Sequence, residues 1–296
     1  MSETCRNYGR FVVCVLVVTF STTLMFAAEV CSDFPERGMI AHRGDGADFP
    51  ENTIPAFLSA IEKGAEMVEL DEWRCKSGEL VVIHDYVVDR VAKDVKGKVS
   101  ELTLAELKSL DVGIRRGEQF RGTRIPTLEE ALAVFPKKGV LINLHCKTGS
   151  AGPEAAEIVK TQGRTRQVVF MMDSFEDVLL MQEKCPWAQI GWVAPAKWRG
   201  VNTEFGEGWW HPWSEAQADK IIGVAIALNV QYLQILFDCR LTKRQTERLH
   251  SAGIKTTYFE CNDPAKMKGL VEEGEDFIFT DRFSKCRSAY ESAIRR

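Results

Sequence analysis

Histidine, lysine and carboxylate side chains stand at the ends of four short apolar runs in this sequence. The residues that share this position are His42, Glu69, Asp71, His84, His145 and Lys147. Carboxylates two residues apart on a strand point to the same side and offer oxygen ligands to a hard divalent cation. Two histidines nearby can serve as proton acceptor and proton donor in a displacement at phosphorus. These residue types predict metal-assisted chemistry on a phosphate ester.

Arg43 and Lys147 supply positive charge at two of the same run ends. Such cations neutralise phosphoryl oxygens. The alternative for the Glu69 and Asp71 pair is a structural salt bridge to one of these cations. Glu-x-Asp alone does not separate a metal site from an ion pair, and the two histidines favour the metal site.

The elements that must position these residues alternate along the chain from residue 38 onward. The predicted strands are 38–42, 67–71, 80–84, 140–146, 167–172, 189–193, 231–237, 254–260 and 276–280. The predicted helices are 53–63, 103–110, 127–135, 153–161, 175–184, 214–227, 242–251 and 263–273. Strands that alternate with helices predict an α/β fold with a parallel sheet.

A TIM-type (β/α)8 barrel is the predicted architecture, because its strand ends converge on one mouth and would gather the polar residues there. Nine predicted strands exceed eight, so at least one is misassigned or lies outside the barrel. The stretch 85–126 is polar and glycine-rich with one short helix. We interpret it as a small insertion after the third strand, packed beside the barrel.

The chain resembles the glycerophosphodiester phosphodiesterase family, a group of phospholipase C-like phosphodiesterase TIM barrels. The matching motifs are His42-Arg43-Gly44, Pro50-Glu51-Asn52-Thr53, Glu69-Leu70-Asp71, His84-Asp85, Ile125-Pro126-Thr127-Leu128-Glu129-Glu130, Ser174-Phe175, Asn262-Asp263 and Thr280-Asp281. They keep the family's order at similar spacing and extend over roughly 38–283, so together they are specific although each alone is weak.

The resemblance implies a metal-dependent hydrolysis of glycerophosphodiesters to glycerol phosphate and an alcohol. It implies a calcium- or magnesium-type cation at Glu69 and Asp71, with His42 and His84 as the acid–base pair. Family enzymes commonly attack through the neighbouring glycerol hydroxyl and pass through a cyclic phosphate. Such a step needs no nucleophile from the protein.

The resemblance also implies that Arg43 and Lys147 bind the phosphate. Glu51 matches the family's Glu-Asn-Thr motif, and we expect it to support the site or contact substrate near His42. The alternative for Glu51 is a carboxylate that stabilises the start of the following helix. Asp281 matches the family's Thr-Asp pair and is expected to orient a neighbouring strand-end group.

His145 departs from the family pattern, which has a glutamate two residues before the strand lysine. We expect His145 to be a third metal ligand, with a structural histidine as the alternative. An imidazole in place of a carboxylate removes one negative charge and shifts preference from Ca or Mg toward Mn or Zn. The identity of the metal is therefore open.

Glu260 is a second departure, in Phe259-Glu260-Cys261-Asn262, where the family commonly has Trp-Thr-Val-Asn. Its carboxylate could replace the missing negative charge at the metal, or select a cationic or hydroxyl-rich substrate. A solvated strand-end carboxylate is the third interpretation.

The N-terminus has the layout of a signal peptide. Arg6 and Arg10 precede an uncharged run from 11 to 26, and Ala27-Ala28 follow it. That run is shorter than the roughly 20 residues of a membrane span. We therefore expect a cleaved leader at 1–28, a catalytic domain at 29–296, and an exported protein, periplasmic or secreted.

Seven of the nine cysteines, all but Cys5 and Cys14, lie after the leader. Their wide spacing argues against a zinc cluster, and an odd number leaves at least one unpaired. We expect most of them to be buried as small apolar residues.

Six of the seven tryptophans fall between 187 and 213. They predict either an aromatic wall for a headgroup, sugar or lipid surface, or a loop packed by its own aromatics. The first interpretation would place the protein near a membrane or cell surface. His211 and His250 are expected to be surface residues without a catalytic role.

The resemblance implies a small-molecule phosphodiester as the partner, and a net charge of -4 gives no indication of nucleic-acid binding. Two other functions stay open: a lyase that ends at the cyclic phosphate, and a catalytically weakened binding protein that captures a cell-surface ligand. Neither the headgroup nor the oligomeric state can be inferred from the sequence.

Overall fold

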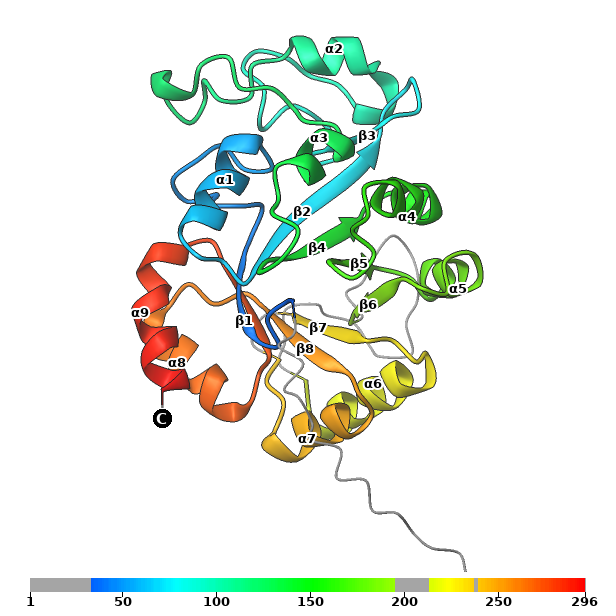
Figure 1. The fold of residues 1–296 in the computed structure, drawn as a ribbon, viewed down its shortest axis with the longest axis vertical. Helices are drawn as coiled ribbons and strands as arrows, with labels where there is room; N and C mark the ends of the chain where they lie inside the picture. The colour runs from blue at the N-terminus through cyan, green and yellow to red at the C-terminus, as the bar shows by residue number, and fades with distance from the viewer. Residues whose placement is uncertain (1–32, 195–212, 237–238, 296) are drawn as a thin grey trace, which may run out of the picture. The chain divides into compact units, whose positions relative to one another are not determined.

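A closed barrel of parallel strands forms the centre of the molecule (Figure 1). The computed structural model describes residues 33–194, 213–236 and 239–295. Its strands are β1 (Gly38–Ala41), β2 (Met67–Arg74), β3 (Leu80–Val82), β4 (Leu141–Cys146), β5 (Val168–Met172), β6 (Gln189–Val193), β7 (Tyr232–Leu236), β8 (Lys255–Phe259) and β9 (Phe277–Thr280). Neighbours other than β3 pair in parallel, and β1 pairs with both β2 and β9. This closure confirms the predicted TIM-type barrel.

β3 accounts for the excess of predicted strands. It pairs antiparallel with the outer half of β2, with Val81 opposite Trp73, and lies outside the barrel. In Figure 1, β2 runs on beyond the other strands to reach it. The prediction that His84 ends a barrel strand is therefore wrong, because His84 follows this return strand.

The helices cover the outside of the barrel (Figure 1). They are α1 (Ile54–Glu62), α2 (Leu104–Ser109), α3 (Leu128–Ala133), α4 (Gly152–Thr161), α5 (Phe175–Lys184), α6 (Glu215–Ala227), α7 (Lys243–Ser251), α8 (Pro264–Glu273) and α9 (Phe283–Ile294). Thr103 and Thr127 form capping boxes with Glu106 and Glu130, and the Asp263 side chain caps α8. These caps explain why the sequence predicted those helix starts well.

α9 was not predicted. Phe283, Cys286 and Tyr290 are buried at helical spacing, and the helix packs on α8 and β1. Arg282 makes no side-chain cap at its start. The apolar period was present in the sequence, but no start signal accompanied it.

Strand alternation separates two apolar layers. Leu70 and Cys146 belong to the outer layer under the helices, whereas Ile40, Met67 and Phe277 fill the barrel interior. These side chains are almost completely buried. Burial of one such large apolar side chain stabilises the fold by about 1.5–3 kcal/mol. The two layers fix the strands rigidly below the polar mouth.

The predicted insertion is confirmed and has a small core of its own. It contains η1 (Val99–Glu101), α2 and η2 (Glu118–Phe120), while a third 3-10 turn, η3 (Gly149–Ala151), precedes α4. Val88, Val99 and Leu107 pack with Val81 and Ile83 of the β3 segment. The insertion is thus attached to the hairpin that carries His84.

The cysteines of the described residues are buried, which agrees with their expected role as small apolar residues. They are Cys75, Cys146, Cys185, Cys239, Cys261 and Cys286. His250 is partly exposed and binds Asp276 at 2.8 Å. In the part of the chain that the structure describes, none of the helices has both the length and the apolar character of a membrane span.

Three of the clustered tryptophans belong to the core. Trp192 is buried in β6, and Trp187 and Trp213 pack against the outer apolar layer. For these residues the packed interpretation holds. The leader at 1–28, Trp198, Trp209, Trp210 and His211 lie outside the described residues.

Candidate active site

The carboxyl ends of β2 and β4 bring the predicted metal ligands together. In the parallel register, Asp71 lies opposite His145 and Glu69 lies opposite Asn143. One ligand atom from each of Glu69, Asp71 and His145 lies within 4.8 Å of the others. Strand alternation and register therefore assemble two carboxylates and an imidazole from distant parts of the sequence.

Glu69 and Asp71 differ strongly in their tendency to ionise. Burial and the neighbouring Asp71 charge raise the pKa of Glu69 well above its usual range. Burial opposes ionisation of Asp71 as well, but Lys147, His84 and Arg43 outweigh it and hold the pKa of Asp71 far below its usual range. The pair thus holds one negative charge firmly, and a further cation would stabilise the second.

Asn52 fixes the orientation of Asp71. Its Nδ2 donates to Asp71 Oδ2 at 2.8 Å, and its Oδ1 accepts the Asp71 N–H at 3.2 Å. Asp71 Oδ1 faces Lys147 Nζ at 3.3 Å and His145 Nδ1 at 3.6 Å, and it has no hydrogen bond within the described residues. The salt bridge considered for the acidic pair is therefore present. Asp71 Oδ1 takes part in it through charge alone and accepts no hydrogen bond within the described residues.

His145 is held at both ring nitrogens. Lys147 Nζ lies 3.0 Å from Nδ1, and Asp173 Oδ1 lies 2.9 Å from Nε2. Because an ammonium only donates, Nδ1 is the acceptor and Nε2–H is donated to Asp173. Nδ1 is therefore unprotonated, which is the tautomer that a metal ligand requires, and it lies 3.6 Å from Asp71 Oδ1; in this structure its lone pair accepts from Lys147.

Asp173 was missed in the sequence. It follows β5 directly, so its position at a predicted strand end was the available signal.

Arg43 lies at a sharp turn after β1. It adopts φ +56°, and its N–H donates to Glu69 Oε2 at 2.8 Å. The next residue, Gly44, has φ +79°, and a Cβ there would come within 2.8 Å of the α1 backbone. Arg43 Nη1 binds Glu51 Oε1 at 2.9 Å, and its Nε lies 3.8 Å from Asp71 Oδ2. The turn thus aims a guanidinium at the acidic centre.

Glu51 supports Arg43 rather than the helix that follows. α1 begins at Ile54 and has no acidic residue in its first turn. Arg90 binds both Glu51 oxygens, at 2.6 and 2.8 Å, and its Nε binds Asp85 at 2.6 Å. Burial opposes ionisation of Glu51, but Arg90 and Arg43 lower its pKa. Arg90 was not predicted, because it lies inside the insertion away from any strand end.

His42 is oriented by Asp281, as the Thr-Asp motif led us to expect. His42 Nδ1 lies 2.6 Å from Asp281 Oδ1, and its ring packs edge-on against Phe259 and Phe279. Burial opposes ionisation of Asp281, but its contact with His42 holds its pKa far below the usual range. With Nδ1 occupied, Nε2 is the ring nitrogen left for a substrate.

His84 also has a carboxylate at Nδ1, but it follows β3 and not a barrel strand. Its Nδ1 lies 2.7 Å from Asp85 Oδ1, and its carbonyl accepts from Trp73 Nε1 at 2.9 Å. The Ile83 N–H donates to the Asp71 carbonyl at 3.0 Å, which aligns the end of β3 with the acidic centre. The antiparallel return of β3 therefore brings His84 back to the mouth that the other residues reach on barrel strands.

Burial lowers the pKa of His84. The nearby cations Arg43 and Lys147 act in the same direction, against the carboxylates of Asp71 and Asp85. His84 is consequently favoured in its neutral form at pH 7.

Glu260 lies with the His42 pair and not with Glu69. Its Oε2 is 3.8 Å from His42 Nδ1. His42, Glu260 and Asp281 also offer ligand atoms within 4.8 Å of one another, but the 2.6 Å contact with Asp281 already occupies the His42 nitrogen. Burial and the neighbouring Asp281 raise the pKa of Glu260 to about 7.

A cavity of about 460 Å³ opens at this mouth. Among the described residues it is lined by His42, Arg43, Gly46, Glu51, Phe259, Glu260 and Asp281. Its lining is rich in charge, and the volume suits a small polar ligand.

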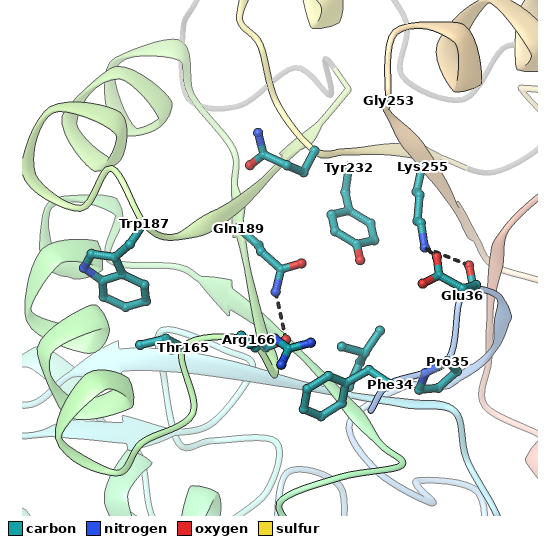
Figure 2. A pocket seen from close by; sticks show the side chains of 12 residues that line it. Phe34, Pro35, Glu36, Thr165, Arg166, Trp187, Gln189, Tyr232, Gly253 and Lys255 are labelled. Carbon is teal, nitrogen blue, oxygen red and sulfur yellow. Dashed lines mark hydrogen bonds and ion pairs between the residues drawn. The ribbon is translucent and has the colours of Figure 1, made fainter. Parts of the chain in front are cut away.

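A second cavity, of about 360 Å³, lies at the opposite end of the barrel, where β4, β6, β7 and β8 begin (Figure 2). There Lys255 binds Glu36, and Gln189 donates to the Arg166 carbonyl at 3.0 Å. Its described lining contains no histidine and no pair of neighbouring carboxylates. The predicted acid–base residues His42 and His84 lie instead at the carboxyl mouth, the usual catalytic face of this barrel.

The residues present fit a divalent cation. Asp71 Oδ1 is buried without a hydrogen bond, Glu69 is difficult to ionise without added positive charge, and His145 has an unprotonated Nδ1 that a cation could take over from Lys147. Two carboxylates and one imidazole suit Mg, Ca, Mn or Zn, and the donor set alone does not choose among them.

The model of the Glycerophosphoryl diester phosphodiesterase family matches residues 42–285. A glycerophosphodiester phosphodiesterase of Caldanaerobacter subterraneus is 50% identical over 248 residues, covering 82% of this chain and 93% of that protein. One of Bacillus subtilis is 26% identical over 96% of this chain and 99% of its own length.

Solved structures agree with these relatives. A phosphodiesterase of Oleispira antarctica, determined in complex with the product sn-glycerol-3-phosphate, superposes with a TM-score of 0.71 at 26% identity, covering 86% of this chain and 96% of that one. A glycerophosphodiester phosphodiesterase of Thermotoga maritima gives 0.64 at 25% identity, with 87% and 97% coverage. The chain is a phosphoric diester hydrolase built on a TIM barrel. It belongs to the glycerophosphoryl diester phosphodiesterase family.

Proposed function

We propose that the chain hydrolyses glycerophosphodiesters to glycerol phosphate and an alcohol, with His42 and His84 as the acid–base pair beside a divalent cation. The observation that carries the proposal is the parallel arrangement of two histidines. Each has a carboxylate at Nδ1, 2.6 Å from His42 and 2.7 Å from His84. Both leave Nε2 available for a reacting oxygen.

Glu69, Asp71 and His145 would hold the cation, and Asp173 would keep His145 in the required tautomer. When bound, a divalent cation supplies Lewis-acid polarisation of a phosphoryl oxygen.

His84 is the better candidate for the first proton acceptor. It is favoured in its neutral form because burial, Arg43 and Lys147 lower its pKa. His42 lies on the side of β8 and β9, against Asp281 and near Glu260. There it would donate a proton to the departing alkoxide while Asp281 stabilises its charged ring.

Arg43 and Lys147 would neutralise the phosphoryl oxygens. Both side chains are largely buried, at 17% and 6% exposure, and both approach Asp71. Charge placed in advance around the reacting phosphorus lowers the barrier more than charge that must reorganise.

The attacking hydroxyl would come from the substrate or from water. The described residues that line the cavity include no serine, threonine or cysteine. This supports attack by the neighbouring glycerol hydroxyl, followed by hydrolysis of a cyclic phosphate.

The test is release of phosphomonoester from glycerophosphocholine by purified chain that has been stripped with chelator and resupplied with Ca, Mg, Mn or Zn singly. His42→Ala and His84→Ala should each lower kcat at least 100-fold with less than a threefold change in KM, the pattern of an interaction made in the transition state. A kcat within threefold of wild type for either variant would remove that histidine from the mechanism. A cyclic phosphate as final product would favour a lyase.

Residues 1–28 are proposed to direct export. The arginines before the apolar run and Ala27-Ala28 after it support this, and Edman sequencing of secreted or periplasmic chain would locate the cleavage. An N-terminus that stays intact in the cell would contradict it.

A further inference from the structure

One wall of the active-site cavity carries more negative charge than its neighbours balance. Glu260 and Asp281 both approach His42 Nδ1, at 3.8 and 2.6 Å. Asp281 is matched by His42 and by Asn262, whose Nδ2 donates to Asp281 Oδ2 at 3.0 Å. Glu260 Oε2 receives no hydrogen bond within the described residues, and the Glu260 side chain is 28% exposed. A second carboxylate therefore lines the cavity beside Asp281, with which it shares a hydrogen bond.

The positive charge of the cavity is already engaged elsewhere. Arg43 binds Glu51 at 2.9 Å and lies 3.8 Å from Asp71. Glu51 is shared in turn with Arg90, at 2.6 Å. Arg43 lowers the pKa of Glu260 only in part, since burial and Asp281 raise it to about 7. The raised pKa of Glu260 reflects a hydrogen bond shared with Asp281 as well as the repulsion between the two charges, and a cation placed beside the pair would favour its fully ionised form.

A phosphodiester brings its own negative charge to this cavity, so a neutral or anionic alcohol next to Glu260 would add nothing to offset it. An alcohol with an ammonium group would be attracted to both carboxylates. The Phe259 ring also lines the cavity, and aromatic rings bind ammonium groups favourably. Carboxylate and ring together are a recognised environment for a cation, whereas hydroxyl groups gain much less from excess negative charge.

We propose that Glu260 is a specificity-determining residue that selects glycerophosphodiesters whose alcohol carries a positive charge, such as an amino or quaternary ammonium alcohol. The inference rests on the proposed function, since it concerns the substrate of the same site. It assigns the alcohol portion of the diester to the His42 side of the phosphorus, where Glu260 and Phe259 lie.

The test compares kcat/KM for glycerophosphocholine with kcat/KM for glycerophosphoglycerol, whose alcohol is uncharged. Wild type is compared with Glu260→Gln, Glu260→Asp and the control Asp48→Asn. Asp48 is an exposed carboxylate that binds Lys63, so its loss changes net charge equally without touching the cavity wall. Glu260→Gln should lower the choline-to-glycerol ratio about five- to twentyfold, the effect of one opposite charge at a partly solvated rim. Glu260→Asp should keep most of the ratio, and Asp48→Asn should leave it unchanged.

The preference should also depend on pH. Below pH 7 Glu260 is mostly protonated, so the ratio for wild type should rise as pH increases through 7. The ratio for Glu260→Gln should stay flat over the same range.

An unchanged ratio in Glu260→Gln would overturn the proposal, and so would an equal loss on both substrates, which would make Glu260 a general part of the reaction. If wild type turned over neither diester with any metal, the proposed function would fail instead. Calorimetric titration of the two diesters into wild type and Glu260→Gln would then still test the selectivity. Equal relative affinities in both proteins would refute it.

Discussion

Replacing Asp281 by asparagine should move the proton of the neutral His42 ring from Nδ1 to Nε2. Asp281 Oδ2 accepts from Asn262 Nδ2 at 3.0 Å, while Oδ1 faces His42 Nδ1 at 2.6 Å. In Asp281→Asn the amide oxygen would stay with the Asn262 donor, which leaves the amide NH2 facing His42. Nδ1 would then have to accept, and the proton would move to Nε2, the nitrogen needed by the substrate.

The magnitude follows from the contact that is lost. A hydrogen bond to a charged group contributes about 1.5–3 kcal/mol. At ~1.4 kcal/mol per tenfold in rate, kcat should fall about 10- to 100-fold. KM should change little, because Asp281 acts through His42 and does not bind the phosphate.

The assay is steady-state hydrolysis of glycerophosphocholine at saturating metal, with bound metal and thermal midpoint measured alongside. Asp85→Asn makes the equivalent change at the second histidine, His84, and is measured in parallel. Arg90 also binds Asp85, at 2.6 Å, and would hold the amide oxygen there in the same way. A kcat of Asp281→Asn within threefold of wild type, with the fold intact, would refute the assignment of Asp281 as the residue that orients His42.

Three further outcomes are expected. His145→Glu should shift the metal that best restores activity toward Ca or Mg, measured by titrating each metal into stripped chain; an identical order of metals would make His145 structural. Arg90→Ala should lower kcat/KM about three- to tenfold by loosening Glu51 and Asp85, and it should leave metal affinity unchanged in a fluorescence titration. Glu275 is buried, and burial raises its pKa from the usual 4.5 to about 7, so wild type should lose up to about 3 kcal/mol of unfolding free energy between pH 4.5 and 7 as the unfolded carboxyl ionises first. Urea unfolding of Glu275→Gln at pH 5 and pH 8 should lack that loss, and an identical pH dependence in both proteins would contradict this account.

The sequence predicted the barrel well because its strands and caps are encoded locally. The predicted helices 103–110, 127–135 and 263–273 start where the side chains of Thr103, Thr127 and Asp263 form caps. Helix α9 lacked such a cap and was missed, although its buried face has helical spacing.

The site was predictable where a residue lies at a strand end within a motif. Glu69, Asp71 and His145 meet as expected, because parallel register follows from the barrel. Arg90 could not be found in this way, since its contact with Glu51 depends on how the insertion folds back. His84 was placed at the right mouth for the wrong reason, because antiparallel pairing of β3 cannot be read from an apolar run alone.

The β2–β3 hairpin carries one of the two histidines that we propose for proton transfer. His42 follows β1, a strand that closes the barrel. His84 follows β3, which is joined to the insertion. Exchange of the segment from β3 through the insertion between relatives would transfer His84, its carboxylate partner Asp85 and Arg90 together. Variation in this segment can therefore change one proposed catalytic group while the strands that precede Arg43 and Lys147 stay the same, so its two ends are suitable junctions for chimeric enzymes.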